Sequence, residues 1–391
     1  MVFEIPLGQP QVLCPYGRLK FEVIAPLSCN AAAPASQVGT SYLCSRQAVL
    51  MRYIGSKVNL LSEIRSVVDS QAPGSKVFCD IFAGTGVVGR EFKPSHEIIS
   101  NDILYFSYVL NAAYNGLPRR PDFKSLSKKL GSDPIDFLNA ISVSETELSP
   151  DDFMALSYSP AGADGRLYLS VENALKIDRI RQTIASWLET GDITELESFY
   201  FLASLIEDVP SVSNTTGTYG AFLKHWDKRA LKPITLSHLE IVESTNANRI
   251  FNADANDLIH QISGDVLYLD TPYNGRQYSS NYHLLESLAK YDRPELKGVT
   301  GTRVDKSGES AYCRKNSVYD SFDYLLGNAD FSTIVISYSS DGLLNEEQLT
   351  ELMSKHGNEK SLNFRKIPYR RYKRTANDER QVLEYLIAIN K

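Results

Sequence analysis

Residues 265–278 of this 391-residue chain read DVLYLDTPYNGRQY and place a carboxylate at the end of an apolar run. Val266–Leu269 has the short, β-rich composition of a buried strand. The strand ends at Asp270, and Pro272 and Tyr273 follow in a turn-rich segment. In an open α/β sheet, ligands bind outside the carboxyl ends of the strands. Asp270 can accept from an exocyclic amine, the backbone around Pro272 can offer a carbonyl, and Tyr273 can stack on a ring. The stretch therefore predicts a pocket for a flat, amine-bearing ring.

The segment D-T-P-Y-N at 270–274 resembles the (D/N/S)-P-P-(Y/F) motif of the amino-methyltransferases. These enzymes methylate the exocyclic nitrogen of adenine or cytosine with S-adenosylmethionine, and the initial aspartate is more similar to the adenine-N6 members, the D12 class. The resemblance implies that Asp270, Pro272 and Tyr273 are catalytic residues. Thr271 departs from the motif, in which the usual residue is proline. Because Asp, Pro, Asn and Gly all form turns, the segment alone also fits an ordinary exit from a strand.

A second apolar strand ends in the glycine-rich turn F-A-G-T-G at residues 82–86. Glycines let the backbone turn tightly and approach a ligand closely. A lone G-x-G equally fits a dinucleotide site, but the longer D-x-F-x-G-x-G resembles the cofactor motif of the same family. The resemblance implies that Asp80, Phe82, Gly84 and Gly86 border S-adenosylmethionine.

Two further acids end predicted strands. Asp102 follows E-I-I-S-N, roughly 20 residues after the glycine turn, where nucleoside-binding α/β folds place the acid that binds ribose hydroxyls. Its alternative role is the N-cap of the next helix. Asp254 ends the run I-F-N-A. The resemblance places Asp254 on the adenine side of the cofactor site and makes Asp270 a neighbour of the cofactor.

Residues 53–57, Y-I-G-S-K, precede an amphipathic helix with apolar residues at helical spacing. A glycine-serine turn at a helix start is an anion site, although a plain helix start gives the same pattern. The segment resembles the motif before the cofactor strand in the family. The resemblance implies that Tyr53 and Lys57 contact the methionine end of the cofactor.

The composition is ordinary for a soluble globular protein, with 43% hydrophobic and 23% charged residues. The net charge of -6 means that any nucleic-acid site must be a local basic patch. The five cysteines are scattered, which favours a reducing compartment, and no Cys/His cluster has metal-ligand spacing. No run reaches the length of a membrane span. These features predict a cytoplasmic protein without a metal site, and the resemblance adds an association with the nucleoid of a prokaryote or with a phage.

Residues 116–245 interrupt the α/β rhythm with helical and loop-rich sequence. Leu196–Ile206 predicts a core helix, and residues 211–229 are polar, then basic and aromatic. Hydroxyl, amide and basic side chains suit base edges and phosphates, although a polar loop and a solvated helix have the same composition. In the subgroup that this chain resembles, the target-recognition insert occupies this place. The resemblance therefore favours DNA contact, and the candidate residues are Asn214, Thr216, Tyr219 and Lys224.

A second basic stretch lies near the C-terminus at residues 365–374, RKIPYRRYKR, with six basic residues and no acid. In an acidic chain such clustering predicts a phosphate-contacting surface, with Arg370 and Arg371 as candidates. A solvated edge strand has a similar composition.

The order of the motifs predicts a doubly wound α/β mixed sheet, the fold of S-adenosylmethionine-dependent methyltransferases, with a mainly helical insert. Residues 51–115 are the predicted cofactor half, 116–245 the target-recognition insert and 246–391 the catalytic half. Residues 1–50 lack a sustained period, and Met51 stands before the first motif, so they are a predicted dispensable extension.

The predicted function is methyl transfer from S-adenosylmethionine to the N6 amine of adenine in duplex DNA, without a metal. By analogy with restriction–modification systems, a partner restriction endonuclease is implied. Two alternatives remain open: an RNA or cytosine-N4 methyltransferase on the same fold, and a catalytically silent DNA-binding protein.

Overall fold

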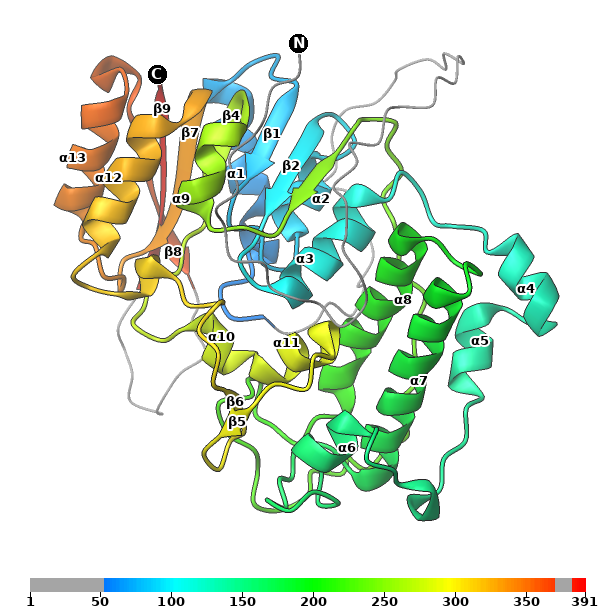
Figure 1. Cartoon of the computed structure of the whole chain (residues 1–391). Helices are drawn as coiled ribbons and strands as arrows, with labels where there is room; N and C mark the ends of the chain where they lie inside the picture. The colour runs from blue at the N-terminus through cyan, green and yellow to red at the C-terminus, as the bar shows by residue number, and fades with distance from the viewer. Residues whose placement is uncertain (1–52, 370–381) are drawn as a thin grey trace, which may run out of the picture. The chain divides into compact units, whose positions relative to one another are not determined.

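A seven-stranded mixed sheet forms the centre of the fold in the computed structural model, which describes residues 53–369 and 382–391 (Figure 1). Five neighbouring strands, β3, β2, β1, β4 and β7, are parallel to one another, and β9 runs antiparallel to both β7 and β8. The predicted mixed α/β sheet is therefore confirmed. In spatial order the strands are β3 (Arg249–Phe251), β2 (Glu97–Asn101), β1 (Val77–Asp80), β4 (Ser263–Leu269), β7 (Asp330–Ser339), β9 (Val382–Asn390) and β8 (Asn363–Tyr369). The predicted extension, 1–50, lies outside the described residues.

Both faces of the sheet are covered by helices, because strand side chains alternate between two hydrophobic clusters. Along β1, Phe78 belongs to one cluster and Cys79 to the other. Along β4, Val266 and Leu267 repeat this alternation. The helices on the first side are α1 (Leu61–Gln71) and α2 (Val87–Phe92), and those on the second are α9 (Ala255–Leu258), α12 (Val318–Asn328) and α13 (Glu346–His356).

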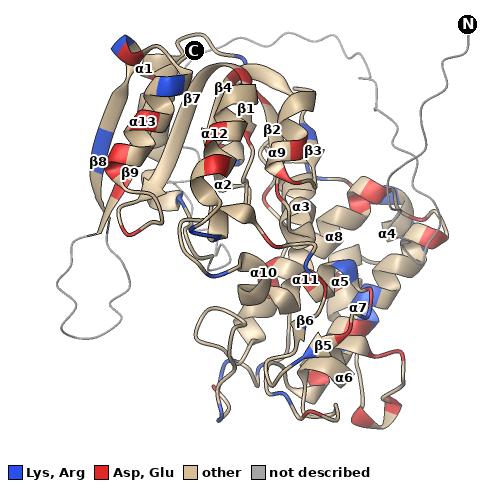
Figure 2. Ribbon diagram, turned by 60° about the vertical axis from the view of Figure 1, so that its left-hand side comes forward, with Lys and Arg blue, Asp and Glu red and all other residues tan. Residues whose placement is uncertain are grey.

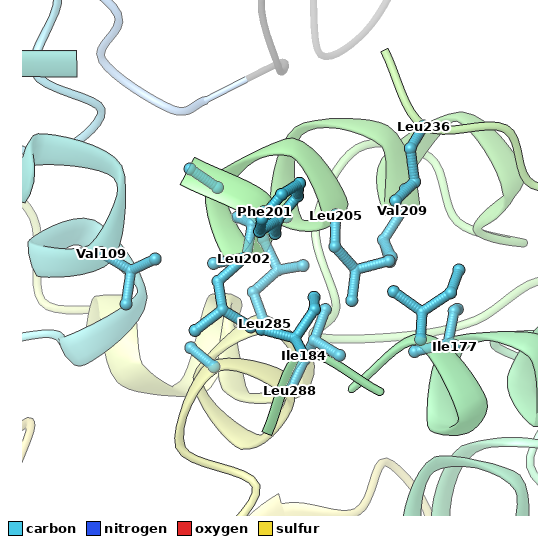
Figure 3. Close-up of a cluster of buried hydrophobic side chains, with 14 of the residues drawn as sticks. Val109, Ile177, Ile184, Phe201, Leu202, Leu205, Val209, Leu236, Leu285 and Leu288 are labelled. Atoms are coloured by element: carbon cyan, nitrogen blue, oxygen red, sulfur yellow. The ribbon is translucent and has the colours of Figure 1, made fainter. Parts of the chain in front are cut away.

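The segment predicted as an insert is mainly helical and shares its hydrophobic core with helices on either side of it in the sequence. Figure 3 shows Val109, Leu202 and Leu285 gathered in this core, from α3, α8 and α11. Since α11 follows the Asp270 turn, the segment predicted as an insert packs directly on part of the predicted catalytic half. The helices are α3 (Tyr105–Asn111), α4 (Lys124–Leu130), α5 (Pro134–Asn139), α6 (Phe153–Tyr158), α7 (Val171–Glu189), α8 (Glu195–Asp208), α10 (Tyr278–Asn281) and α11 (His283–Lys290).

The predicted core helix at Leu196–Ile206 is part of α8, which begins with a capping box. Thr194 Oγ1 accepts from the backbone N–H of Glu197 at 3.2 Å, and Glu197 Oε2 accepts from the N–H of Thr194 at 2.8 Å. These bonds satisfy N–H groups that have no partner inside the helix, so the start of α8 is fixed locally.

Two predicted helices differ from the observed ones. The helix expected over 105–114 ends at Asn111 and continues as a π-helical turn, Ala112–Gly116, where the buried Lys93 Nζ donates to the carbonyls of Tyr114 and Leu117 at 2.6 Å. The helix expected over 278–290 is broken at Tyr282. The hydroxyl of Tyr282 accepts from the N–H of Ile54 at 2.8 Å, so the break anchors the segment before α1.

A short antiparallel pair, β5 (Leu296–Lys297) and β6 (Thr302–Arg303), follows α11. The turn between β5 and β6 is held to the insert by buried Arg166, which donates to the carbonyls of Gly298 and Val299 at 3.2 and 3.1 Å. The chain then returns toward the sheet, and residues 308–313 reach the pocket described below.

Candidate active site

A hollow of about 910 Å³, partly open to solvent, lies at the carboxyl ends of the parallel strands β1, β2 and β4. An open α/β sheet binds its ligands at this edge. The hollow brings together side chains from segments far apart in the sequence. Among its lining residues are the predicted cofactor residues Tyr53, Lys57, Asp80, Phe82, Gly84, Asp102, Asp254 and Asp270, together with Pro272.

The glycine-rich turn after β1 takes a conformation that favours glycine. Gly84 and Gly86 have φ of +51° and +73°. A Cβ on Gly86 would lie 2.6 Å from Asn111 Oδ1, and a Cβ on Gly84 would lie 3.0 Å from the Tyr53 ring. Gly86 lies behind the hollow rather than in its wall, so its role in this structure is to let α2 start close to α3.

Asp102 ties the glycine turn to the end of β2. Its Oδ2 accepts from the N–H of Gly84 and its Oδ1 from the N–H of Leu104, both at 2.8 Å. Burial raises the pKa of Asp102 to about 6, against the opposing effect of these two backbone hydrogen bonds. The N-cap of α3 is Leu104 rather than Asp102, so the helix-capping alternative is wrong, and the carboxylate of Asp102 borders the hollow.

Two other acids line the same hollow. Asp80 is 1% exposed, and its Oδ1 has no hydrogen-bond partner among the described residues. Burial, followed by the charges of Asp270 and Asp102, raises the pKa of Asp80 well above its usual range. Asp254 caps α9 by accepting from the N–H of Asn256 at 2.8 Å. Asp80 is thus an unsatisfied acceptor that a donor in the hollow can engage.

Lys57 and Asp270 form a buried ion pair at the centre of the site. Lys57 is 4% exposed, and its Nζ lies 2.7 Å from Asp270 Oδ1 and 3.3 Å from Glu384 Oε1. Nζ also donates to the carbonyl of Gly55 at 3.1 Å. Burial alone lowers the pKa of Lys57, but the charges of Asp270 and Glu384 outweigh it and hold the pKa above its usual value. The ammonium therefore has acceptors within the protein for all three of its protons.

Asp270 keeps one oxygen available on the side of the hollow. Its Oδ1 is taken by Lys57, no described residue donates to Oδ2, and its side chain is 20% exposed. Burial raises the pKa of Asp270 to about 6, with Lys57 lowering it and Glu384 raising it. The group is an anionic acceptor at neutral pH.

Aromatic rings hold the segment 53–57 against the Asp270 turn. The Tyr53 ring stacks on Tyr282 with centroids 4.8 Å apart. A Cβ on Gly55, whose φ is +80°, would lie 3.5 Å from Tyr278 Oη and 3.6 Å from the Tyr273 ring. The predicted catalytic Tyr273 thus lies beside the backbone that carries Lys57.

The comparison with known protein families agrees with this geometry. The sequence profile described as D12 class N6 adenine-specific DNA methyltransferase matches residues 53–352, which include the insert and every residue that lines the hollow. The chain belongs to this family.

Several known methyltransferases match across most of this chain. The type II methyltransferase M.FokI of Planomicrobium okeanokoites is 46% identical over 344 residues, covering 87% of this chain and 53% of the relative. The modification methylase StsI of Streptococcus sanguinis is 42% identical, with 52% of its length covered. The chain thus spans about half the length of these two relatives. The type II methyltransferase M.NlaIII of Neisseria lactamica is 38% identical over 351 residues, covering 99% of the relative.

Thr271, where the chain departs from the D12 motif, is buried. It is 1% exposed, and its Oγ1 has no hydrogen-bond partner among the described residues. Asp270 and Pro272 on either side line the hollow, whereas Thr271 does not. The departure from the motif is therefore outside the lining of the pocket.

Two of the predicted DNA-contacting residues of the D12 insert are buried in this structure. Asn214 is 0% exposed, donates to the carbonyl of Leu223 at 3.1 Å and accepts from the N–H of Asp227 at 2.9 Å. Tyr219 is 2% exposed and belongs to the hydrophobic core. Their polar groups shape the loop, so neither side chain is accessible to DNA in this arrangement.

The other predicted DNA-contacting residues are exposed or lie outside the described residues. Thr216 and Lys224 are exposed. Figure 2 shows basic residues on the edge strand β8, where Arg365 and Lys366 form ion pairs with Glu63 and Glu346 at 3.3 and 2.7 Å. This part of the basic run fits the edge-strand alternative. Arg370 and Arg371 lie outside the described residues.

Sequence reasoning missed several residues that contribute to the site. Glu384 contacts Lys57 from β9, and the signal for it is a single acid in the otherwise apolar strand VLEYLIAIN. The charged, glycine-containing composition of the segment after α11 is typical of a loop near a substrate, but no motif marks its individual residues. The lining residues that were missed in this segment are Gly308, Ser310, Tyr312 and Cys313, and two more are Tyr278 at the start of α10 and Gln277 before it.

Within residues 53–369 and 382–391, no group of three or more His, Cys, Asp or Glu side chains is arranged to hold a metal ion. Across the same residues, every helix is too short or too polar to cross a membrane.

Proposed function

We propose that this chain transfers a methyl group from S-adenosylmethionine to the N6 amine of adenine in duplex DNA. The observation that carries the proposal is the Asp270 carboxylate of a D12 family member. The side chain lines the hollow, one oxygen is held by Lys57, and no described residue donates a hydrogen bond to the other. An acceptor in that position suits an exocyclic N–H.

The excess of negative charge among the side chains that line the hollow supports a cationic methyl donor. Asp80, Asp102, Asp254 and Asp270 line it, against a single basic side chain, Lys57. S-adenosylmethionine supplies a sulfonium methyl group and an ammonium, and these two positive charges complement the excess of carboxylates. The unpartnered Oδ1 of Asp80 offers a buried acceptor for such a ligand.

The reaction requires the chain to orient an amine rather than to form a covalent bond with it. The target adenine must leave the DNA stack to reach the hollow. Asp270 Oδ2 and a backbone carbonyl near Pro272 would accept from the two amine protons, and Tyr273 would stack on the base. These bonds direct the nitrogen lone pair toward the methyl group, so positioning and electrostatics supply the catalysis.

The DNA surface that we propose includes the exposed residues of the insert loop. Thr216, Lys224, Lys228 and Arg229 are exposed, and they follow Asn214, whose amide fixes the loop. Basic groups there suit phosphates. We include Arg370 and Arg371 in this proposal on their sequence alone, since the run 365–374 is basic.

The biological setting is also a proposal. M.FokI and M.NlaIII are named type II methyltransferases. By analogy, the methylation would protect DNA from a partner restriction endonuclease, in the cytoplasm of a prokaryote or of a phage-infected cell.

The test is incubation with methyl-labelled S-adenosylmethionine and mixed-sequence duplex DNA, followed by digestion to nucleosides. We expect label in N6-methyladenine from the wild type, and a loss of at least about 100-fold in Asp270→Ala, which removes the acceptor but leaves cofactor binding measurable. Asp330→Ala is the matched control, since Asp330 is exposed at the start of the neighbouring strand β7. Label in cytosine or RNA, or full activity in Asp270→Ala, would overturn the proposal.

A further inference from the structure

The buried cluster around Lys57 contains more negative than positive charge. Glu384 is 4% exposed on β9, and its Oε1 lies 3.3 Å from Lys57 Nζ while accepting from Ser337 Oγ at 2.7 Å. Asp270 lies on the other side of the same ammonium at 2.7 Å. One ammonium thus faces two carboxylates. A single carboxylate would be enough to neutralise Lys57, so the second one needs an explanation.

We propose that Glu384 is a positioning residue of the methyl-transfer site, which acts through Lys57 to set the orientation and the acceptor strength of Asp270. This inference rests on the proposed function. Glu384 does not line the hollow, and Lys57 separates it from Asp270. Its effect on substrate is therefore indirect.

The orienting effect follows from the hydrogen bonds of the ammonium. Lys57 Nζ has the Gly55 carbonyl and Glu384 as its other acceptors, so the third N–H is directed at Asp270 Oδ1. Ser337 fixes Glu384 from the adjacent strand β7. Oδ1 is then held by the ammonium, and Oδ2 is left for the amine.

The electrostatic effect follows from the excess carboxylate. The groups that face Glu384 are Lys57 from the segment before α1, Asp270 and Tyr268 from β4 and its turn, and Ser337 from β7. With Glu384 charged, Lys57 is shared between two anions. Asp270 is therefore less neutralised than in a simple pair, and it accepts a hydrogen bond more strongly.

The decisive variant is Glu384→Gln, which keeps the shape of the side chain and an acceptor for Lys57 but removes the charge. We expect kcat to fall by roughly tenfold, the scale on which outer partners tune a functional ligand. We expect KM for DNA and cofactor to stay within about twofold of wild type, because neither touches Glu384. The acid limb of the pH–rate profile should move to lower pH, since a negative charge beside Asp270 is lost.

A matched control is Glu91→Gln. Glu91 is 5% exposed in α2, pairs with Arg65 at 3.7 Å and does not line the hollow. We expect this variant to lose stability while its kcat and pH profile match wild type. If Glu384→Gln behaves like Glu91→Gln, Glu384 is structural and the inference is overturned.

A second variant, Glu384→Asp, keeps the test decisive if Glu384→Gln does not fold. The charge remains but is withdrawn from Lys57 by one methylene, so kcat should still fall. A wild-type kcat in either folded variant overturns the inference. An inactive wild type would instead refute the proposed function, so the two failures are distinguishable.

Discussion

Replacing Lys57 by methionine removes the cation from a buried cluster that holds two carboxylates. Lys57 is 4% exposed, and both Asp270 and Glu384 lie within 3.3 Å of its Nζ. Removing one partner of a buried pair leaves uncompensated charge and costs about 3–5 kcal/mol. Because Asp270 is 20% exposed, water screens part of this cost, and we expect a loss near the lower end, about 3 kcal/mol at pH 8.

The loss should depend on pH in a defined direction. Without Lys57, burial and the neighbouring Glu384 raise the pKa of Asp270 in the folded protein further above its value in the unfolded chain. The folded protein then binds more protons than the unfolded chain at mildly acidic pH, so its stability rises as pH falls. Wild-type Asp270 already has a pKa of about 6, and Lys57 is the group that lowers it. The loss of unfolding free energy in Lys57→Met, relative to wild type, should therefore be largest above pH 7 and smaller below pH 6.

Urea denaturation of wild type and Lys57→Met at pH 8 and pH 5.5 measures both the loss of stability and its dependence on pH. Lys360→Met is the control, since Lys360 is exposed, and it should change stability by less than about 0.5 kcal/mol. The double variant Lys57→Met/Glu384→Gln should recover part of the loss, because it removes one of the two repelling charges. A loss of the same size at both pH values would show that Lys57 contributes packing rather than charge, and would refute the reasoning.

Two further outcomes follow from the site. At saturating DNA and cofactor, the wild-type kcat should fall about tenfold between pH 8 and pH 5. The pKa of Asp270 is about 6, so at pH 5 only about a tenth of its side chains are ionised. A flat pH profile would contradict the role of Asp270. Lys224→Gln and Lys228→Gln should each reduce the slope of log binding constant against log salt concentration by the equivalent of about one phosphate contact. Asn214→Ala should instead lower the melting temperature without changing that slope. The reverse pattern would refute the assignment of the loop.

The strands and the pocket edge were predictable because they depend on local signals. An apolar run followed by Asp270, and another followed by F-A-G-T-G, identify strand ends, and parallel strands bring such ends to one edge. The alternation of Phe78 and Cys79 between two clusters also follows from the period of a strand.

Other features depend on contacts that local sequence does not encode. Asn214 and Tyr219 are polar residues in a polar segment, so composition placed them at a surface, yet they are buried by a loop that folds back onto itself. The break at Tyr282 is set by a hydrogen bond to Ile54, far away in the sequence. Helical periodicity carries no information about such a partner.

The position of Glu384 links the end of the chain to the chemistry proposed for its centre. Lys57 precedes the first strand of the sheet, Asp270 follows β4, and Glu384 lies on β9, which enters the sheet antiparallel beside β7. The ion pair between Lys57 and Asp270 can form without β9, but its second carboxylate and the bond from Ser337 cannot. The antiparallel strand therefore does more than pair with the edge of β7. It delivers Glu384, the buried carboxylate that adds a second negative charge beside the Lys57–Asp270 pair.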